Sequence, residues 1–98
     1  MKIVWSPLAI ERMSDIAQYI AQDNPDATAK WINKVFKKVG RLNDFPKSGR
    51  KVPETKRTDI LEIFYGNYRI IYRLRQNEIS ILTVRHGKQI LPQEDISD

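Results

Sequence analysis

The sequence predicts an α+β domain of order β-α-α-β-β-β, in which a helical hairpin packs on one face of a twisted, mostly antiparallel sheet. Residues 60–87 contain three consecutive runs rich in Ile, Val, Tyr, Phe and Thr, residue types that favour β-strands. Residues 7–42 contain two amphipathic helical patterns with one short break between them. A chain of 98 residues is expected to form one domain around one core.

The chain begins with a short apolar strand, expected over residues 2–5, and continues into a helix. Ser6 is a favoured N-cap, and Pro7 is tolerated at the first helical position because its missing N–H would be unpaired there. The apolar stripe of this helix consists of Leu8, Met13, Ile16, Ala17 and Ile20. The helix ends at Asn24-Pro25, because the residue before a proline avoids helical geometry.

Asn24 and Pro25 also favour the start of a second helix, which runs to about Leu42. Its apolar side carries Trp31, Ile32, Val35, Phe36, Val39 and Leu42. Its opposite side carries Lys30, Lys34, Lys37, Lys38 and Arg41 within an arc of roughly 100°. Because the link is short, the two helices form an antiparallel hairpin. The basic stripe is either a solvated helix face or a contact for phosphates or an acidic partner.

Residues 43–58 form one irregular stretch, interrupted by two prolines and a glycine. It carries five cations, at positions 47, 50, 51, 56 and 57. A loop of this length is either functional or a mobile connection. After the last strand, residues 88–98 become acidic, and we expect them to form a flexible C-terminal tail of the single domain 1–98.

The turns between the three strands predict their pairing. If Gly66-Asn67 is a two-residue turn, the partners are Tyr65 and Tyr68, Phe64 and Arg69, Ile63 and Ile70, Glu62 and Ile71, and Leu61 and Tyr72. If Gln76-Asn77 is the next turn, the partners are Arg73 and Ser80, Tyr72 and Ile81, Ile71 and Leu82, and Arg69 and Val84. A slip of one residue would exchange the faces of a strand.

This pairing divides the side chains between two faces of the sheet. One face is almost wholly apolar, which predicts that it covers the core, and it carries Leu61, Ile63, Tyr68, Ile70, Tyr72, Leu74, Ile79, Ile81 and Thr83. The other face is mixed and carries Glu62, Phe64, Arg69, Ile71, Arg73, Leu82, Val84 and His86. The charged groups of the second face are the first place to look for chemistry.

Composition narrows the classes of function. The chain has no cysteine, which excludes disulfides, thiolate metal sites and cysteine nucleophiles and fits a reducing compartment. No apolar run is long enough to cross a bilayer, and the first residues show no signal peptide, so a cytoplasmic location is expected. A net charge of +5 and a pI near 9.6 favour a nucleic acid, a ribosome or an acidic protein as partner.

The mixed face has two interpretations. Arg69, Arg73 and His86 have the chemistry to hold a phosphate and transfer protons, as an RNA-cleaving site requires. Alternatively, Glu62 lies diagonal to both arginines, and the three form a cross-strand ion cluster. His86 is the only histidine, and no closely spaced carboxylates accompany it, so no metal site is expected. No nucleotide or cofactor fingerprint is present, and no cofactor is expected.

Several segments together resemble the RelE/ParE superfamily of bacterial toxins from type II toxin–antitoxin pairs, whose fold agrees with the predicted layout. The resemblance covers nearly the whole chain. Its segments are residues 5–9 (Trp-Ser-Pro-Leu-Ala), the helical hairpin, residues 45–50 (Phe-Pro-Lys-Ser-Gly-Arg), residues 68–73 (Tyr-Arg-Ile-Ile-Tyr-Arg) and residues 81–87 (Ile-Leu-Thr-Val-Arg-His-Gly).

The superfamily has two main activities, and the resemblance favours the second. RelE-like members cut mRNA in the ribosome, whereas ParE-like members inhibit DNA gyrase and lack the nuclease residues. The sheet arginine is kept as Arg69, but Ile60 and Glu62 stand where the nucleases carry two lysines. Gln89 replaces their arginine after the last strand, and residues 91–98 contain no counterpart of their tyrosine. A glutamate opposes phosphate binding by like-charge repulsion.

The resemblance therefore implies a ParE-like, non-enzymatic inhibitor of DNA gyrase. Its target-binding candidates are Arg50, Lys51, Arg69, Arg73, Arg85 and His86. The alternative is a RelE-like, ribosome-dependent mRNA endonuclease with Arg69, Arg73 and His86 as catalytic residues. A third possibility is a family member that binds its antitoxin and is no longer toxic.

The resemblance also implies a partner, a small cognate antitoxin that forms a hetero-oligomer with the toxin. It would dock a helix on the helical hairpin and add an extended segment to the sheet. The antitoxin-binding candidates are Leu8, Met13, Trp31 and Val35.

Overall fold

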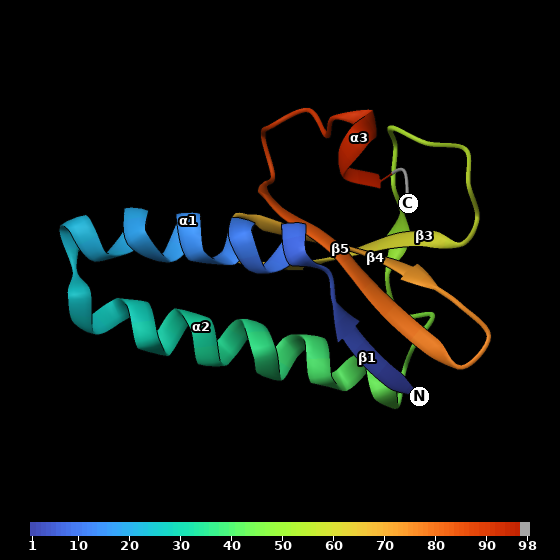
Figure 1. Cartoon of the computed structure of the whole chain (residues 1–98), viewed down its shortest axis with the longest axis horizontal. Helices are drawn as coiled ribbons and strands as arrows, with labels where there is room; N and C mark the ends of the chain where they lie inside the picture. The colour runs from blue at the N-terminus through green and yellow to red at the C-terminus, as the bar shows by residue number, and fades with distance from the viewer. Residues whose placement is uncertain (97–98) are drawn as a thin grey trace.

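The computed structural model describes residues 1–96 and shows a helical hairpin beside a twisted five-stranded sheet (Figure 1). Its elements are β1 (Lys2–Trp5), α1 (Pro7–Asp23), α2 (Pro25–Gly40), the 3₁₀ turn η1 (Arg41–Asn43), β2 (Arg50–Lys51), β3 (Ile60–Tyr65), β4 (Tyr68–Leu74), β5 (Glu78–His86) and α3 (Gln93–Ile96). The predicted fold class is confirmed, and the structure adds η1, the two-residue β2 and the short α3 to the predicted elements.

The strands lie in the order β1-β5-β4-β3-β2. β1 pairs parallel to β5, and all other neighbours pair antiparallel. β2 pairs with only two residues of β3, Leu61 and Glu62. Within the part of the chain that the structure describes, β3 therefore has an open edge from Ile63 to Tyr65.

Both long helices begin at the predicted caps. The Ser6 hydroxyl accepts a hydrogen bond from the Ala9 N–H at 3.0 Å, and the Asn24 side-chain carbonyl accepts one from the Ala27 N–H at 3.2 Å. Ser6 also donates its hydroxyl to the Leu82 carbonyl of β5 at 2.9 Å. The first cap therefore holds the start of α1 against the sheet.

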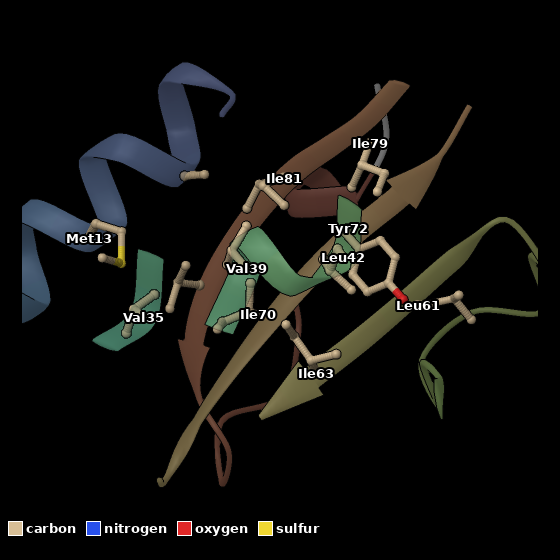
Figure 2. Packing of buried hydrophobic residues seen from close by; sticks show 12 residues of the cluster. Met13, Val35, Val39, Leu42, Leu61, Ile63, Ile70, Tyr72, Ile79 and Ile81 are labelled. Atoms are coloured by element: carbon tan, nitrogen blue, oxygen red, sulfur yellow. The ribbon is translucent and has the colours of Figure 1, made fainter. Parts of the chain in front are cut away.

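The main core lies between the hairpin and the sheet. Figure 2 shows Met13 of α1 and Val35 and Val39 of α2 facing Ile70 of β4 and Ile81 of β5. The same core includes Ala9, Leu42, Leu61, Ile63, Tyr72, Ile79 and Val84. Burial of this apolar surface stabilises the fold by about 25 cal/mol for each Å² removed from water.

A second core covers the other face of the sheet. It consists of Val52, Ile60, Ile71, Leu82, Leu91 and Ile96. We expected a flexible tail over residues 88–98. Leu91 and Ile96 instead pack in this second core and are only 2% and 3% exposed, whereas residues 88–90 are exposed. The end of that predicted tail, residues 97 and 98, lies outside the described residues.

The irregular stretch between η1 and β3 is anchored by Tyr72. The Tyr72 hydroxyl donates to the Pro46 carbonyl at 2.8 Å and accepts from the Gly49 N–H at 3.0 Å. Gly49 lies so close that a Cβ there would stand 2.6 Å from the Tyr72 hydroxyl and 2.8 Å from the Glu62 carbonyl. Residue 49 must therefore be glycine for the loop to pack in this way.

The predicted pairing of the first hairpin is confirmed throughout, but that of the second is wrong beyond Tyr72. Tyr72 pairs with Ile81 as expected, whereas Ile71 pairs with Thr83 instead of Leu82. Leu82 is therefore the extra residue of a β-bulge, which places Leu82 and Thr83 on the same side of the strand.

The bulge exchanges the faces of all residues of β5 that follow it. Arg69 pairs with Arg85 instead of Val84. Val84 lies in the main core under the helices, whereas Thr83 faces α3 and donates to the Asp95 carboxylate at 3.1 Å. Both positions were assigned to the wrong face, and His86 turns with Val84 towards the helical side.

Candidate functional site

A network of ion pairs lies on the face of the sheet that Leu91 and Ile96 of the C-terminal segment cover, called the tail side below. Arg69 is at its centre. Arg69 is 4% exposed and donates from Nε to Glu62 at 2.7 Å and from Nη1 and Nη2 to the two oxygens of Glu54 at 2.8 Å. Its Nη1 also donates to the Gln89 carbonyl of the tail at 3.3 Å. Arg50 reaches Glu62 from β2 at 2.7 Å.

The charges of this network stabilise one another. The hydrogen bonds from Arg69 lower the pKa of Glu54 to about 2, and burial opposes part of that shift. The bonds to Glu54, and then those to Glu62, raise the pKa of Arg69 above its ordinary value. Because two carboxylates and a backbone carbonyl hold its guanidinium, Arg69 is not placed to receive a phosphate from solution.

The predicted cross-strand cluster therefore exists, but with different members. Glu62 and Arg69 pair as expected, while Arg73 donates to Asp59 at 2.9 Å. Hydrogen bonds from Arg57 and then from Arg73 lower the pKa of Asp59, against an opposing effect of burial. No sequence pattern marks Glu54 or Asp59, because neither lies in a segment with strand or helix periodicity.

Arg85 is held by the tail. Its Nε donates to the Asp95 carboxylate at 2.8 Å, and the Asp95 side chain is 2% exposed. The Arg12 guanidinium of α1 lies 3.9 Å from the same carboxylate. Asp95 of α3 thus contacts both Arg85 of β5 and Arg12 of α1. As with Glu54 and Asp59, no sequence pattern marks it.

His86 lies on the other side of the sheet from Arg69. Its ring meets the Tyr68 ring edge-on, with the centroids 5.6 Å apart, and its Nδ1 accepts from the Lys88 N–H at 3.2 Å. It lines a hollow of about 460 Å³ between α1 and the end of β5, together with Arg12, Asp15, Ile16, Tyr19, Tyr68, Val84, Arg85 and Gln89. The structure therefore does not bring Arg69 and His86 together.

Arg50 and Lys51 form the exposed edge strand β2, and Arg50 lines a second hollow of about 560 Å³. The Arg50 guanidinium stacks over the Phe64 ring, 4.8 Å from its centroid. This hollow is lined by Lys38, Arg41, Leu42, Phe45, Ser48, Arg50, Glu62, Ile63 and Phe64. Its walls combine cations with exposed aromatic rings.

Of the four antitoxin-binding candidates, two are closed to a partner. Met13 is 6% exposed and Val35 is fully buried, because both face the sheet. Leu8 and Trp31 are half-buried, and Trp31 packs edge-on against Tyr68 at 5.3 Å. The large apolar side chains that the hairpin exposes are instead Ile10, Tyr19 and Phe36.

Within residues 1–96, no group of histidine and carboxylate side chains is arranged to hold a metal ion. No helix in the same part of the chain is long and apolar enough to span a bilayer.

Comparisons with known proteins agree with the fold. A family profile described as "ParE toxin of type II toxin-antitoxin system, parDE" matches residues 3–91. A relative named "Putative toxin Y4kP", from Sinorhizobium fredii, is 34% identical over 94 residues, which is 94% of each chain. The solved chromosomal ParDE TA system from P. aeruginosa superposes with a TM-score of 0.75 at 16% identity, covering 90% of this chain and 97% of that one.

Proposed function

Because the chain belongs to the ParE toxin family of type II toxin–antitoxin systems, we propose that it inhibits DNA gyrase by binding and that a cognate antitoxin neutralises it. The site of action is then the cytoplasm, where bacterial gyrase meets its DNA. The protein acts as an inhibitor in this proposal and catalyses no reaction of its own.

The separation of the basic residues supports binding rather than RNA cleavage. A nuclease needs a cation and a proton-transferring group around the same phosphate. Here Arg69 is neutralised by Glu54 and Glu62 on the tail side, while His86 lines a hollow on the helical side. The alternative, ribosome-dependent cleavage of mRNA, would require the network around Arg69 to open.

The antitoxin is proposed to cover the exposed apolar side chains of the hairpin and to pair with the open edge of β3. Tyr19 is 66% exposed and Ile10 is 57% exposed, both on α1. No strand of the described residues 1–96 pairs with residues 63–65 on the β2 side, which suits the addition of an extended segment. Met13 and Val35 no longer belong among the expected contacts.

The deciding experiment is a supercoiling assay with purified gyrase, ATP and relaxed plasmid, into which the free toxin is titrated. We expect supercoiling to stop and cleaved plasmid to accumulate. A translation reaction with the same toxin should leave its mRNA intact. Gyrase that stays active at a high molar excess of folded toxin would refute the proposal, and mRNA cleavage that His86→Ala abolishes would establish the ribosomal alternative.

A matched pair of charge reversals maps the contact with gyrase. Lys51 and Lys56 are both exposed and lie five positions apart in the same segment. Lys51→Glu should weaken inhibition because Lys51 lies beside the exposed sheet edge, whereas Lys56→Glu should inhibit as the unaltered protein does. Equal inhibition by both variants would remove Lys51 from the target-binding candidates.

A further inference from the structure

The positive charge of the chain is concentrated in one segment. Residues 27–51 contain eight cations and one acid, Asp44. The remainder of the chain contains nine cations and eleven acids. The net charge of +5 therefore arises entirely from residues 27–51, and the rest of the chain is slightly acidic.

Among the described residues 1–96, seven of these eight cations have no carboxylate partner. Arginines elsewhere form ion pairs, as Arg69, Arg73 and Arg85 do with carboxylates of the loop and the tail. Within the described part of the chain, Arg50 alone among the eight cations has a carboxylate within 4.0 Å, namely Glu62. The other seven are Lys30, Lys34, Lys37, Lys38, Arg41, Lys47 and Lys51. Their charges are available to a ligand.

Five of these seven cations form a stripe: Lys30, Lys34, Lys37 and Lys38 lie on α2, and Arg41 begins η1. The stripe spans roughly 16 Å along the helix axis. The last two of the five, Lys38 and Arg41, also line the 560 Å³ hollow with Arg50. In Figure 1 the green C-terminal end of α2 lies at the end of the molecule where β1 begins, so the stripe runs along the helix from the free hairpin tip towards the sheet.

The hollow at the end of the stripe offers surfaces for stacking. Phe45 is 60% exposed and Phe64 is 37% exposed. The Arg50 guanidinium already lies over the Phe64 ring. Glu62, the acid among the lining residues, has a fully buried side chain that Arg50 and Arg69 neutralise.

We propose that this surface binds single-stranded nucleic acid. The cations of α2 contact successive phosphates, and a base stacks in the hollow against Phe45 or the Arg50–Phe64 pair. Grooves of this kind combine a basic track for the backbone with aromatic side chains for the bases. An acidic polypeptide would also use the cations, whereas a single-stranded nucleic acid uses both the cations and the exposed aromatic rings where the track ends.

The test measures binding of a fluorescent single-stranded DNA by anisotropy, without gyrase. The variant Lys34→Gln/Lys37→Gln/Arg41→Gln removes three charges from exposed positions of the stripe. Its matched control, Lys2→Gln/Lys56→Gln/Lys88→Gln, removes three exposed charges elsewhere. We expect the stripe variant to lose at least about tenfold in affinity and to reduce the slope of log K against log salt by about 2. The control should bind as the unaltered protein does.

Three results would overturn the proposal. The first is absence of binding at about 50 mM salt, where phosphate contacts are strong. The second is an equal loss of affinity in the stripe variant and its control. The third is a poly-glutamate peptide of matched charge that binds as tightly as the DNA and responds to the same variants, which would assign the surface to an acidic protein.

A second variant tests the stacking. Phe45→Leu/Phe64→Leu keeps apolar volume but removes the aromatic faces, and it should weaken single-stranded DNA more than duplex DNA of the same sequence, because paired bases are not free to stack. An equal effect on both would contradict the stacking step. Since these measurements contain no gyrase, their failure leaves the proposed function standing, and inactivity towards gyrase leaves this inference standing.

Discussion

Replacement of Arg69 by methionine tests whether the central ion network holds the sheet together. The change removes one hydrogen bond to Glu62, two to Glu54 and one to the Gln89 carbonyl. Removing one partner of a buried ion pair generally costs about 3–5 kcal/mol. Glu62 has no exposed side-chain surface but keeps Arg50, and Glu54 is 21% exposed and accessible to water. We therefore expect the lower end of that range, about 3 kcal/mol of unfolding free energy.

Urea unfolding of the free toxin, followed by circular dichroism and tryptophan fluorescence, measures this loss. A loss of about 3 kcal/mol also lowers the melting temperature by about 12–24 °C in a domain of this size. The matched control is Arg73→Met, which breaks the partly exposed pair with Asp59 and should cost about 1 kcal/mol or less. If Arg69→Met cost no more than Arg73→Met, the network would not be a source of stability, and Arg69 would return to the target-binding candidates.

Three further predictions concern local contacts. Gly49→Ala should destabilise the fold by about 1–3 kcal/mol, because the added Cβ collides with the buried Tyr72 hydroxyl and a strand carbonyl; an unchanged urea midpoint would show that the loop can move away. Glu54, whose pKa falls from 4.5 to about 2 on folding, stabilises fully above pH 4.5 and loses this effect as the pH falls towards 2. Glu54→Gln should therefore differ from the unaltered protein at pH 6 and converge with it near pH 2, whereas a constant difference would contradict the coupling with Arg69. Asn24→Ala removes the cap of α2 and should cost about 1 kcal/mol, unless melting curves show that the break between the helices tolerates its loss.

The features that the sequence predicted correctly have local signals. The caps at Ser6 and Asn24 depend on a side chain that bonds a backbone N–H three residues later. A few consecutive residues are therefore enough to predict where each helix begins. The pairing of β3 with β4 follows from Gly66, which adopts the positive φ of 57° that a tight turn requires. The fold class follows from these elements and their order.

The bulge at Leu82 was missed because nothing in its sequence marks it. Residues 78–86 contain no glycine or proline, and Leu82 and Thr83 suit either face of a strand. What fixes the bulge lies far away in the chain: the Ser6 hydroxyl bonds the Leu82 carbonyl, and Thr83 bonds Asp95. This single extra residue separates His86 from Arg69 and removes the nuclease-like constellation that the mixed face predicted.

The partners of the arginines were missed for a similar reason. Glu54 comes from the irregular loop and Asp95 from the predicted tail, and both segments lack periodicity. Acidic residues in such segments are usually solvated, so burial of the Asp95 side chain becomes apparent only when the tail is seen packed over the sheet. The irregular stretch 43–58 was expected to be either functional or a mobile connection. In the structure, Val52 attaches it to the second core and Glu54 attaches it to Arg69.

The parallel pairing of β1 with β5 has a consequence for protein synthesis. β1 is the first of the described strands and pairs with β5, the last of them, and the Ser6 hydroxyl bonds the Leu82 carbonyl across 76 positions of sequence. The helical hairpin is made early, yet the strands that bury its apolar side come later in the chain. A nascent or truncated chain that ends before residue 78 therefore lacks an interior strand of the sheet and cannot complete the native packing. Any activity that depends on the finished fold therefore begins only after β5 has been synthesised.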